Sequence, residues 1–531
     1  MPIETIPYAE TGYFSELICD YLAEKEALRP FYHRFPELSQ FESQLLEKKK
    51  AFSVSSREIL VAGLQRQYDN FQISETTREN IESLSKENTF TITTGHQLNL
   101  FTGPLYFLYK IFSVINLTEQ LNKEFSHYHF VPVYWMASED HDFDEINYFN
   151  FHGKKIVWDR EDGGAVGDLS TEGLEKVLEI YKQELGGGEF ADQLLTLFSE
   201  AYLKYNNLAD ATRHLGNELF KDHGLVIVDG NDVEFKKTFL PYAKRELEDQ
   251  LSFRKVSETS SRLKSLGYQE QVSPREINLF YLKEKLRERI IEQDGHFHIN
   301  NTNIDFNADQ LIEELNSNPE RFSPNALLRP LYQEALLPNL CYVGGGGELA
   351  YWLQLKDYFN EVQVPYPILL LRNSVMLISE KNIEKLKRLN VSISELFLPT
   401  LELENLHTHR LSEIEIDFNK QREFLKKQFE DMYETAKKTD ASFLGAVAAQ
   451  EKKQLNGLDK LEKRLLKAQR RKLADELERI TAIQEVLFPG ESLQERQMNF
   501  SEFYLHNGPG LLSLLKKELD ALVNKFSIIR W

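Results

Sequence analysis

The residues that decide the fold are TFTITTGHQ at 89–97, where the character of the sequence changes. Six residues rich in β-branched side chains precede a glycine, which is typical of a buried β-strand that ends in a turn. The following residues, 98–107, read LNLFTGPLYF and place Pro104 where a first helical residue would stand. The apolar spacing of a helix then continues through Leu105, Leu108, Ile111 and Phe112. This stretch predicts a strand, a glycine turn and a helix that begins at Pro104.

Four later apolar runs have the composition of β-strands. They cover residues 129–135, 225–228, 340–343 and 368–371. Helical patterns lie between them, so strands and helices alternate along the chain. Such alternation is the signature of an α/β fold with a parallel sheet.

The C-terminal third has the spacing of a coiled coil. Steps of seven, four, three and four residues join Phe418, Leu425, Phe429, Met432 and Ala436. Asp440 can cap a second helix, whose apolar seam shifts and resumes until Pro489 ends it. We therefore predict an antiparallel coiled-coil hairpin from about Ile414 to Leu487. Its broad apolar face predicts a dimer.

These changes of pattern divide the chain into four predicted segments. They are an N-terminal helical part of the core (1–88), the α/β core with insertions (89–378), the coiled-coil domain (379–495) and a C-terminal segment that packs back on the core (496–531).

Composition indicates a globular protein. Of 531 residues, 41% are hydrophobic and 27% charged, which excludes wholesale disorder. The apolar runs are far shorter than the ~18 residues that cross a bilayer, and the first residues lack the features of a secretory signal. Two cysteines, Cys19 and Cys341, cannot build a disulfide framework or a cysteine-rich zinc site. We expect a soluble, cytoplasmic protein with no membrane partner.

The net charge of −20 limits the classes of binding partner that we expect. Such a field repels polyanions, so we expect no nucleic-acid binding through a broad basic surface. A small anionic substrate is still compatible with this net charge, because a binding pocket needs only a few local hydrogen-bond donors. The basic run from Lys460 to Lys472 favours a solvated coiled-coil face, with an anion site as the minority interpretation.

Three polar clusters follow predicted strands, where ligands bind in open α/β sheets. They are residues 95–97, 138–142 and 344–348. In the first, Gly95 and Gly103 would let the backbone approach a phosphate, with His96 and Lys110 as donors beside a helix N-terminus. The alternative is that the glycines only make the turn and that His96 is a solvated loop residue.

The second cluster carries five carboxylates and a histidine within eight residues, 138–145. It could bind Mg²⁺ through oxygen, orient an ammonium group, or supply a general base with His141. The alternative is a solvated acidic loop that caps the next helix. Its spacing matches no zinc site, and we predict no protein-bound metal.

Two further residues have open interpretations. Arg329, between apolar residues and a proline, is either a buried structural ion pair or a carboxylate clamp. Cys341 lies in an apolar strand without a neighbouring base, which favours a packed thiol over a nucleophile.

Several of these motifs together resemble the BshC family of bacillithiol biosynthesis. They are TGHQ at 94–97, TGPLY at 102–106 with Lys110, PVYWMASEDHD at 132–142, FSPN at 322–325, RPLYQ at 329–333, the glycine turn before Glu348, and LRNS at 371–374. The resemblance implies a Rossmann-like core with insertions, similar to class I aminoacyl-tRNA synthetases, and a coiled-coil domain used in dimerisation. The implied activity is a carbon–nitrogen ligase that adds L-cysteine to the amine of glucosaminyl-malate.

On this basis we assign expected roles. The catalytic residues would be His96, Glu139, Asp140 and His141, and the phosphate-binding residues Gly95, Gln97, Gly103 and Lys110. The substrate-binding residues would be Ser138, Asp142, Asn325, Arg329, Gly346, Glu348, Tyr351 and Arg372.

Three schemes stay open. The cysteine carboxylate could be activated with ATP and Mg²⁺, or arrive already activated, for instance on a tRNA. The third is a non-catalytic coiled-coil interaction protein with a degenerate nucleotide-binding core.

Overall fold

The structure is a computed structural model that describes residues 4–161 and 163–531. The chain divides into two compact units. The first comprises the residues up to Leu377 together with Gln494–Trp531, and the second comprises Ile378–Leu493.

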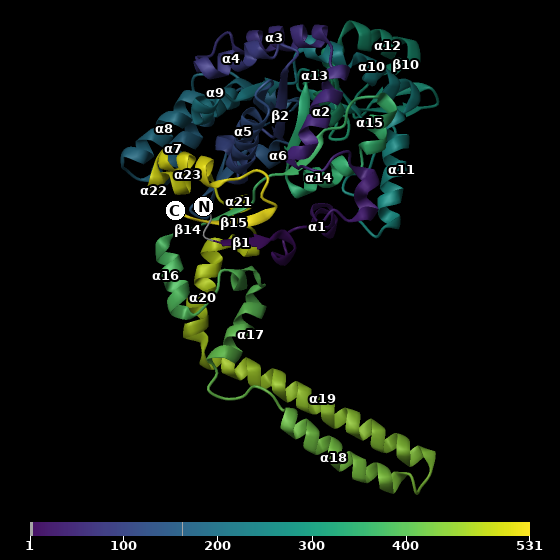
Figure 1. Ribbon diagram of the computed structural model, residues 1–531, viewed down its shortest axis with the longest axis vertical. Helices are drawn as coiled ribbons and strands as arrows, with labels where there is room; N and C mark the ends of the chain where they lie inside the picture. The colour runs from purple at the N-terminus through teal and green to yellow at the C-terminus, as the bar shows by residue number, and fades with distance from the viewer. Residues whose placement is uncertain (1–3, 162) are drawn as a thin grey trace. The chain divides into compact units, whose positions relative to one another are not determined.

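A parallel sheet forms the centre of the first unit (Figure 1). Its strand order within the described residues is β13-β12-β2-β3-β6, and every neighbouring pair is parallel. All five strands lie where the sequence predicts them. They are β2 (Thr89–His96), β3 (His129–Met136), β6 (Val226–Asp229), β12 (Asn339–Gly344) and β13 (Ile368–Leu371). The predicted α/β fold is confirmed.

The order of the strands creates a crevice beside β2. Along the chain the sheet grows from β2 through β3 to β6 on one side, and then from β12 to β13 on the other. This is the Rossmann order, whose ligands bind where the direction of growth reverses, beyond the carboxyl ends of the strands. In this protein that switch point lies between the ends of β2 and β12, at His96 and Gly344.

A helix follows each of these two strands. After β2 comes α5 (Tyr106–Glu124), and after β12 comes α14 (Gly346–Leu353). The prediction that Pro104 is the first helical residue is wrong, because α5 begins two residues later. Residues 98–105 instead form an irregular turn in which Phe101, Thr102 and Gly103 all have positive φ.

The core around the sheet is apolar and fully buried. One cluster joins side chains of α2 (Leu38–Ala51) and α5 to those of β2, β12 and β13. Cys341 is completely buried within it, and burial raises the pKa of its thiol. This environment fits the packed thiol that the sequence favours.

The chain between β6 and β13 contains an antiparallel sheet that the sequence analysis does not anticipate. Its order is β10-β9-β8-β7-β11. The strands are β7 (Leu279–Lys283), β8 (Leu286–Gln293), β9 (His296–Ile299), β10 (Asp305–Asn307) and β11 (Phe322–Pro324). The neighbouring helices are α10 (Val233–Asp249), α11 (Leu251–Ser265), α12 (Ala308–Ser317), α13 (Arg329–Leu336) and α15 (Lys356–Val362).

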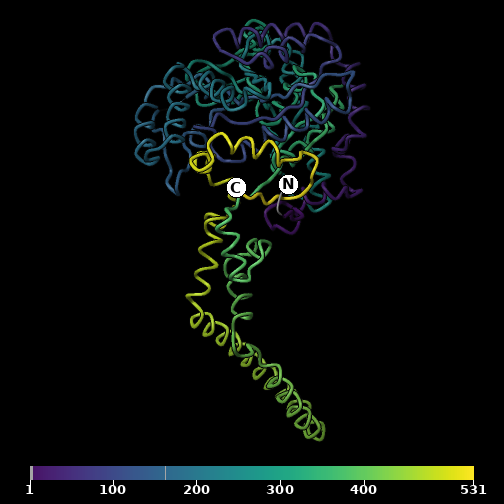
Figure 2. Tube along the Cα trace, turned by 60° about the vertical axis from the view of Figure 1, so that its left-hand side comes forward, coloured from purple at the N-terminus to yellow at the C-terminus, as the bar shows by residue number. Residues whose placement is uncertain are grey.

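The remaining elements of the first unit flank the central sheet. Strand β1 (Glu4–Pro7) pairs antiparallel with β15 (Lys525–Arg530), so the chain ends lie side by side (Figure 2). Between β3 and β6 lie α6 (Phe143–Ile146), β4 (Tyr148–Phe151), β5 (Lys154–Val157), α7 (Leu174–Leu185), α8 (Glu189–Tyr202) and α9 (Leu208–Phe220). The others are α1 (Glu16–Leu22), α3 (Val54–Tyr68), α4 (Glu75–Ser83), α21 (Gln494–Gln497), α22 (Phe500–Asn507) and α23 (Gly510–Glu518), while β14 (Val375–Ile378) follows β13 in the chain.

The second unit is helical and contains the predicted hairpin. Helices α18 (Asn419–Ala436) and α19 (Ala441–Lys472) pack against each other, and Asp440 Oδ1 accepts the Phe443 N–H at 2.9 Å as the predicted cap. The predicted extent to Leu487 is wrong. Helix α19 ends at Lys472, and α20 (Ala474–Leu487) packs on α16 (Glu380–Leu389) and α17 (Thr400–Leu411) instead. One reason is that the Gln484 amide donates to the carbonyls of Leu396 and Leu398.

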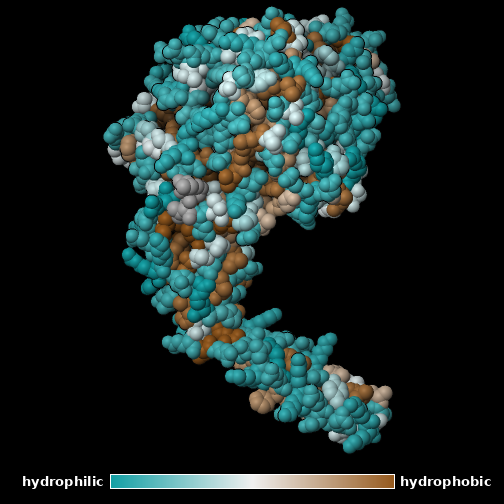
Figure 3. Space-filling view, viewed as in Figure 1, coloured by the Kyte–Doolittle hydropathy of each residue, from teal (hydrophilic) through white to brown (hydrophobic). Residues whose placement is uncertain are grey.

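The surface of the hairpin is mostly hydrophilic, with small apolar patches (Figure 3). Phe424 and Leu461 are 71% and 51% exposed beside a shallow groove between the two helices. Of the basic residues from Lys460 to Lys472, all but Arg470 are exposed, as expected of a solvated face, whereas Arg470 is half-buried and pairs with Glu404 on α17. No helix among the described residues is long and apolar enough to span a membrane.

Candidate active site

A cavity of about 650 Å³ opens at the switch point of the parallel sheet. Its walls come from the carboxyl ends of β2, β3, β12 and β13 and from the antiparallel sheet. Most of the predicted site residues line it, although they come from distant parts of the sequence. They are Gly95, His96, Gln97, Lys110, Glu139, Asp140, His141, Asn325, Arg329, Gly346, Glu348, Tyr351 and Arg372.

Three predicted residues, Gly103, Ser138 and Asp142, are not among the lining residues. The Gly103 N–H donates to the Leu100 carbonyl, and its own carbonyl accepts from Asn499. The next amide, that of Leu105, donates to Met498. The turn at Gly103 therefore has a structural role, and the amides of Gly103 and Leu105 are not available to a phosphate. Asp142 is exposed and precedes α6, but its side chain forms no capping hydrogen bond with that helix.

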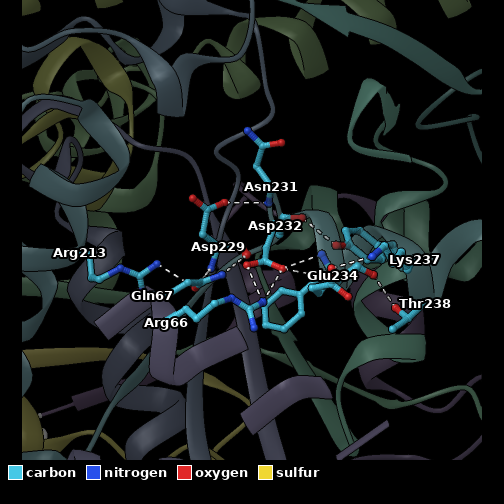
Figure 4. Close-up of polar contacts among 12 residues, drawn as sticks. Arg66, Gln67, Arg213, Asp229, Asn231, Asp232, Glu234, Lys237 and Thr238 are labelled. Carbon is cyan, nitrogen blue, oxygen red and sulfur yellow. Dashed lines mark hydrogen bonds and ion pairs between the residues drawn. The ribbon is translucent and has the colours of Figure 1, made fainter. Parts of the chain in front are cut away.

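Ser138 turns away from the cavity because its hydroxyl donates to Asp229 at the end of β6. Figure 4 shows how Asp229 is held: its main chain exchanges two hydrogen bonds with the Gln67 side chain, to which Arg213 also donates. Burial raises the pKa of Asp229. This network fixes the loop after β3 to the neighbouring strand.

An ion pair connects the two sides of the switch point. Lys110 Nζ on α5 lies 2.6 Å from Glu348 Oε2 on α14 and also donates to the Gly95 carbonyl. Burial would raise the pKa of Glu348, but the charge of Lys110 and hydrogen bonds from Gly345 and Tyr342 hold it below its usual value. Lys110 thus serves the structure of the site, and its charge is compensated.

Arg329 lies directly over the end of β2. Its guanidinium donates to Tyr351 and Gln333 and stacks on Tyr342. A Cβ on Gly95 would lie 3.4 Å from Arg329 Nη1, so a glycine here lets the arginine approach the backbone. Among the described residues no carboxylate lies within 4 Å of Arg329, so the structural ion pair considered for it is not formed.

Arg372 follows β13 directly and is held in place by a buried ion pair. Its Nη2 donates to Glu495 at 2.8 Å in a buried ion pair, and Nη1 donates to Asn373 and Ser374. Nε has no partner among the described residues, although Arg372 is only 3% exposed. One donor therefore remains for a ligand.

His96 is buried rather than solvated, contrary to the alternative that the sequence leaves open. Its ring packs against Tyr106 and Phe107. Burial and the charge of Lys110 lower the pKa of His96 to about 3, so the ring is neutral. A hydrogen bond to the backbone of Thr102 raises this pKa, as donation to a carbonyl does, while Nε2 has no partner among the described residues. With Nδ1 as the donor to that carbonyl, Nε2 keeps a buried lone pair that no described group uses.

The acidic loop after β3 is largely neutralised. Glu139 pairs with the buried Lys236 on α10. Asp140 accepts from Gln97 at 3.0 Å and from the His141 N–H at 2.8 Å, and Arg287 lies 3.8 Å away. Although burial alone would raise the pKa of Asp140, these contacts hold it well below its usual value. The first two carboxylates of the loop are therefore enclosed and partnered, whereas Asp142, Asp144 and Glu145 are exposed, as in the alternative of a solvated loop.

His141 cannot act alone as a base in this arrangement. Arg287 Nη1 lies 2.6 Å from His141 Nδ1. Because a guanidinium only donates, Nδ1 accepts and Nε2 carries the proton. His141 thus offers a donor to the cavity.

Four arginines of the cavity were missed by sequence reasoning. They are Arg275, Arg287, Arg289 and Arg496. Arg287 and Arg289 lie two residues apart on β8, so they share one face. The Asp294-Gly295 turn, with positive φ at both residues, could have indicated the β8–β9 hairpin. Nothing in the sequence indicates that this hairpin faces the parallel sheet.

The cavity therefore carries an excess of positive charge inside an acidic protein. In the described structure, no carboxylate lies within 4 Å of Arg275, Arg289, Arg329 or Arg496. No group of three or more His, Cys, Asp or Glu residues that could hold a metal ion occurs among residues 4–161 and 163–531. The donor set fits the phosphates of ATP, whereas Mg²⁺ would have to bind chiefly through those phosphates.

Two family models match this chain. The first, "Bacillithiol biosynthesis BshC, N-terminal Rossmann-like domain", matches residues 1–373. The second, "Bacillithiol biosynthesis BshC, C-terminal coiled-coil domain", matches residues 375–531.

Curated relatives match over the full length. A protein of Flavobacterium johnsoniae named "Putative cysteine ligase BshC" is 55% identical over 529 residues, which cover 100% of both chains. A Christiangramia forsetii protein of the same name is 54% identical over 533 residues, covering 100% of this chain and 99% of its own.

A solved structure is distantly similar. It is titled as a putative arginyl-tRNA synthetase of Campylobacter jejuni and is 10% identical, with a TM-score of 0.24 over 89% of this chain and 99% of that chain. This likeness is too weak to support an inference about function. The full-length matches confirm the resemblance seen in the sequence, and the chain belongs to the BshC family of bacillithiol biosynthesis.

Proposed function

We propose that this protein is a ligase that joins the carboxyl group of L-cysteine to the amine of glucosaminyl-malate. The observation that carries the proposal is the cavity at the switch point, where arginines without a carboxylate partner surround a buried neutral histidine. Glucosaminyl-malate has two carboxylates and one amine, so it needs cations at one end and acceptors at the other. The printed name of the relatives, a cysteine ligase, agrees with this chemistry.

The cysteine carboxylate must be activated before an amine can attack it. With ATP, the carboxylate oxygen would displace pyrophosphate to give an adenylate, or displace ADP to give an acyl phosphate. The amine would then form the amide and release the nucleotide or phosphate. Gly95, Gln97 and Lys110 stay proposed neighbours of the phosphates, because they lie at the end of β2 in the cavity.

The attacking nitrogen must be a free amine, because an ammonium is not nucleophilic. Of the proposed catalytic residues, His96 offers a lone pair on Nε2 that no described group uses. Glu139 and Asp140 lie beside Lys236 and Arg287 and fit the orientation of an ammonium group. His141 and Arg287 would donate to a developing oxyanion or to a substrate hydroxyl.

The malyl carboxylates would be clamped by arginines. Arg329 is our first candidate, because three neighbours fix its guanidinium and none of them is a carboxylate. Asn325, Glu348 and Tyr351 line the same part of the cavity and stay proposed substrate contacts. We also propose a homodimer formed through the hairpin of α18 and α19.

Reconstitution tests the proposal directly. Purified protein would be incubated with cysteine, glucosaminyl-malate, ATP and Mg²⁺, and the amide product measured by mass spectrometry, with each component omitted in turn. Release of pyrophosphate indicates an adenylate, and release of phosphate an acyl phosphate. Product formed only from pre-charged cysteinyl-tRNA would support the scheme without ATP.

A matched pair of variants guards against a contaminating activity. Arg329→Gln should lose at least ~100-fold in kcat/KM, whereas Arg78→Gln, an exposed arginine on α4 outside the cavity, should match the wild type. No product in any arm, together with unchanged bacillithiol in a deletion strain, would favour the non-catalytic interaction protein.

A further inference from the structure

The glycine run after β12 forms part of the cavity wall. Gly345, Gly346 and Gly347 all line the cavity, and α14 begins at Gly346. The first amides of a helix have no intrahelical acceptor. In the described residues no backbone group accepts from the N–H of Gly346 or Gly347. Backbone donors and the positive end of a helix therefore meet the cavity without any side chain between them.

A buried donor without a partner faces the same glycines. The Nε of Arg372 would lie 3.8 Å from a Cβ on Gly345, and it has no hydrogen-bond partner among the described residues. The other two nitrogens of the guanidinium are held by Glu495, Asn373 and Ser374. These contacts fix the direction of Nε. A donor this deeply buried is costly to leave unpaired, so the geometry implies a ligand acceptor here.

The charges around this point favour an anion. Lys110, Arg372 and Arg496 line this side of the cavity, where Glu348 compensates Lys110 and Glu495 compensates Arg372, so Arg496 adds one positive charge in excess. Both oxygens of Glu348 are already engaged, by Tyr342 on one side and by Lys110 and Gly345 on the other. Arg496 is exposed and has no carboxylate within 4 Å in the described structure.

The other helix start at the switch point, that of α5, is more occupied. The amides of Gly103 and Leu105 already donate to backbone carbonyls, as described above, and of the residues from Gly103 to Tyr106 only Tyr106 has an N–H without an acceptor in the described structure. The start of α14 offers the two successive amides of Gly346 and Gly347 instead.

We infer that Gly346, Gly347, Arg372 and Arg496 form an oxyanion subsite that binds a phosphoryl or carboxylate group of a substrate. This inference rests on the proposed ligase function and names the chemical group that binds on the β12–α14 side of the cavity. A nucleotide phosphate and a malyl carboxylate share the required chemistry, three or more acceptor lone pairs with negative charge. Titration with phosphate-bearing and carboxylate-bearing probes distinguishes the two groups.

The test uses the full chain and calorimetric titration with three probes: ATP with Mg²⁺, inorganic pyrophosphate and L-malate. Gly347 is the position to change, because a Cβ there would meet only Gln271 Nε2 at 3.9 Å and its φ is not positive. Gly347→Asp adds a negative charge beside the subsite, and Gly347→Asn adds the same shape without charge. The aspartate also suits a helix N-terminus, so it should not destabilise the fold.

We expect Gly347→Asp to weaken binding of one probe class by about tenfold or more, with Gly347→Asn within about threefold of the wild type. Loss for ATP and pyrophosphate assigns a phosphoryl group, and loss for L-malate assigns a carboxylate. Arg372→Lys keeps the pair with Glu495 but removes Nε, and should weaken the same probe. Arg496→Gln, an exposed change, replaces Gly347→Asp if that variant fails to fold.

The inference is overturned if no probe binds the wild type, or if the aspartate and asparagine variants bind equally. The experiments also distinguish a failure of this inference from a failure of the ligase proposal. Normal ligation kinetics in Gly347→Asp would remove the subsite and keep the ligase. Charge-dependent binding with no product from any substrate combination would keep the subsite and remove the ligase.

Discussion

Lys110 Nζ on α5 lies 2.6 Å from Glu348 Oε2 on α14, so an ion pair between a buried lysine and a half-buried glutamate bridges the two helices that leave the switch point. The pair holds the two walls of the cavity at a fixed separation. Gly95, whose carbonyl Lys110 also contacts, ties the pair to the end of β2.

Breaking this pair should cost both stability and activity. Lys110→Met leaves the Glu348 charge without its cation, and we expect a loss of about 3–5 kcal/mol in the free energy of unfolding. Lys110→Met combined with Glu348→Gln should recover part of that loss, because no charge stays unpaired. Denaturant titration of the three proteins measures both effects. A single variant as stable as the wild type would show that the pair does not hold the site together.

His96 should make the stability of the protein fall in mild acid. Burial and the nearby Lys110 lower its pKa to about 3 in the folded protein, against about 6.5 in the unfolded chain. Between these values the unfolded state binds the proton and the folded state does not, so stability falls as the pH drops through this window. From pH 7 to pH 5 this group should cost roughly 2 kcal/mol. Comparing that loss in the wild type and in His96→Asn isolates the contribution, and equal losses would contradict a neutral buried ring.

His96 should also affect the rate. If its Nε2 lone pair accepts from the attacking amine, His96→Ala should lower kcat by about 100-fold or more. Because the ring is buried against Tyr106 and Phe107, this variant should also lose stability, unlike a solvated loop residue. Turnover is therefore measured per folded molecule, at a temperature well below the midpoint of unfolding. Near-normal turnover would leave the loop of Glu139 and Asp140 as the likelier catalytic centre.

Cys341 should contribute packing alone. The side chain is fully buried in the core and is not among the cavity-lining residues. Cys341→Ser should cost roughly 1–2 kcal/mol of stability through a buried hydroxyl, with turnover per folded molecule unchanged. A folded variant without turnover would make the thiol catalytic.

The hairpin should hold a dimer together. Phe424 and Leu461 expose apolar surface beside the groove between α18 and α19. Replacing both by glutamate should yield a monomer in light scattering, without loss of helical content. The matched control replaces Lys463 and Arg471, which are exposed and charged, by glutamate. A dimer that survives the first pair would place the interface elsewhere.

The central sheet could be predicted from the sequence because its signal is local. A strand buried on both faces is rich in apolar or β-branched residues along its length, as residues 89–94, 129–135 and 368–371 are. Polar residues at the ends of such strands then meet at one edge. That is why His96, Asp140 and Glu348 were expected to lie together, and they do line one cavity.

What only the tertiary structure decided is how each polar group is partnered. In the sequence the acidic loop has no neighbouring cation. In the structure Glu139 forms an ion pair with Lys236, and Asp140 with Arg287, residues nearly 100 and 150 positions further along the chain. Likewise, Pro104 has the local features of a helix start. The Met498 carbonyl, however, accepts from the Leu105 N–H, and the Asn499 amide donates to the carbonyls of Phe101 and Gly103, so these contacts hold residues 101–105 in a turn. The sequence determined the strands of the parallel sheet because burial and backbone preference act over a few residues. The charge state, exposure and free donors of the site depended on contacts between distant segments, which no local pattern encodes.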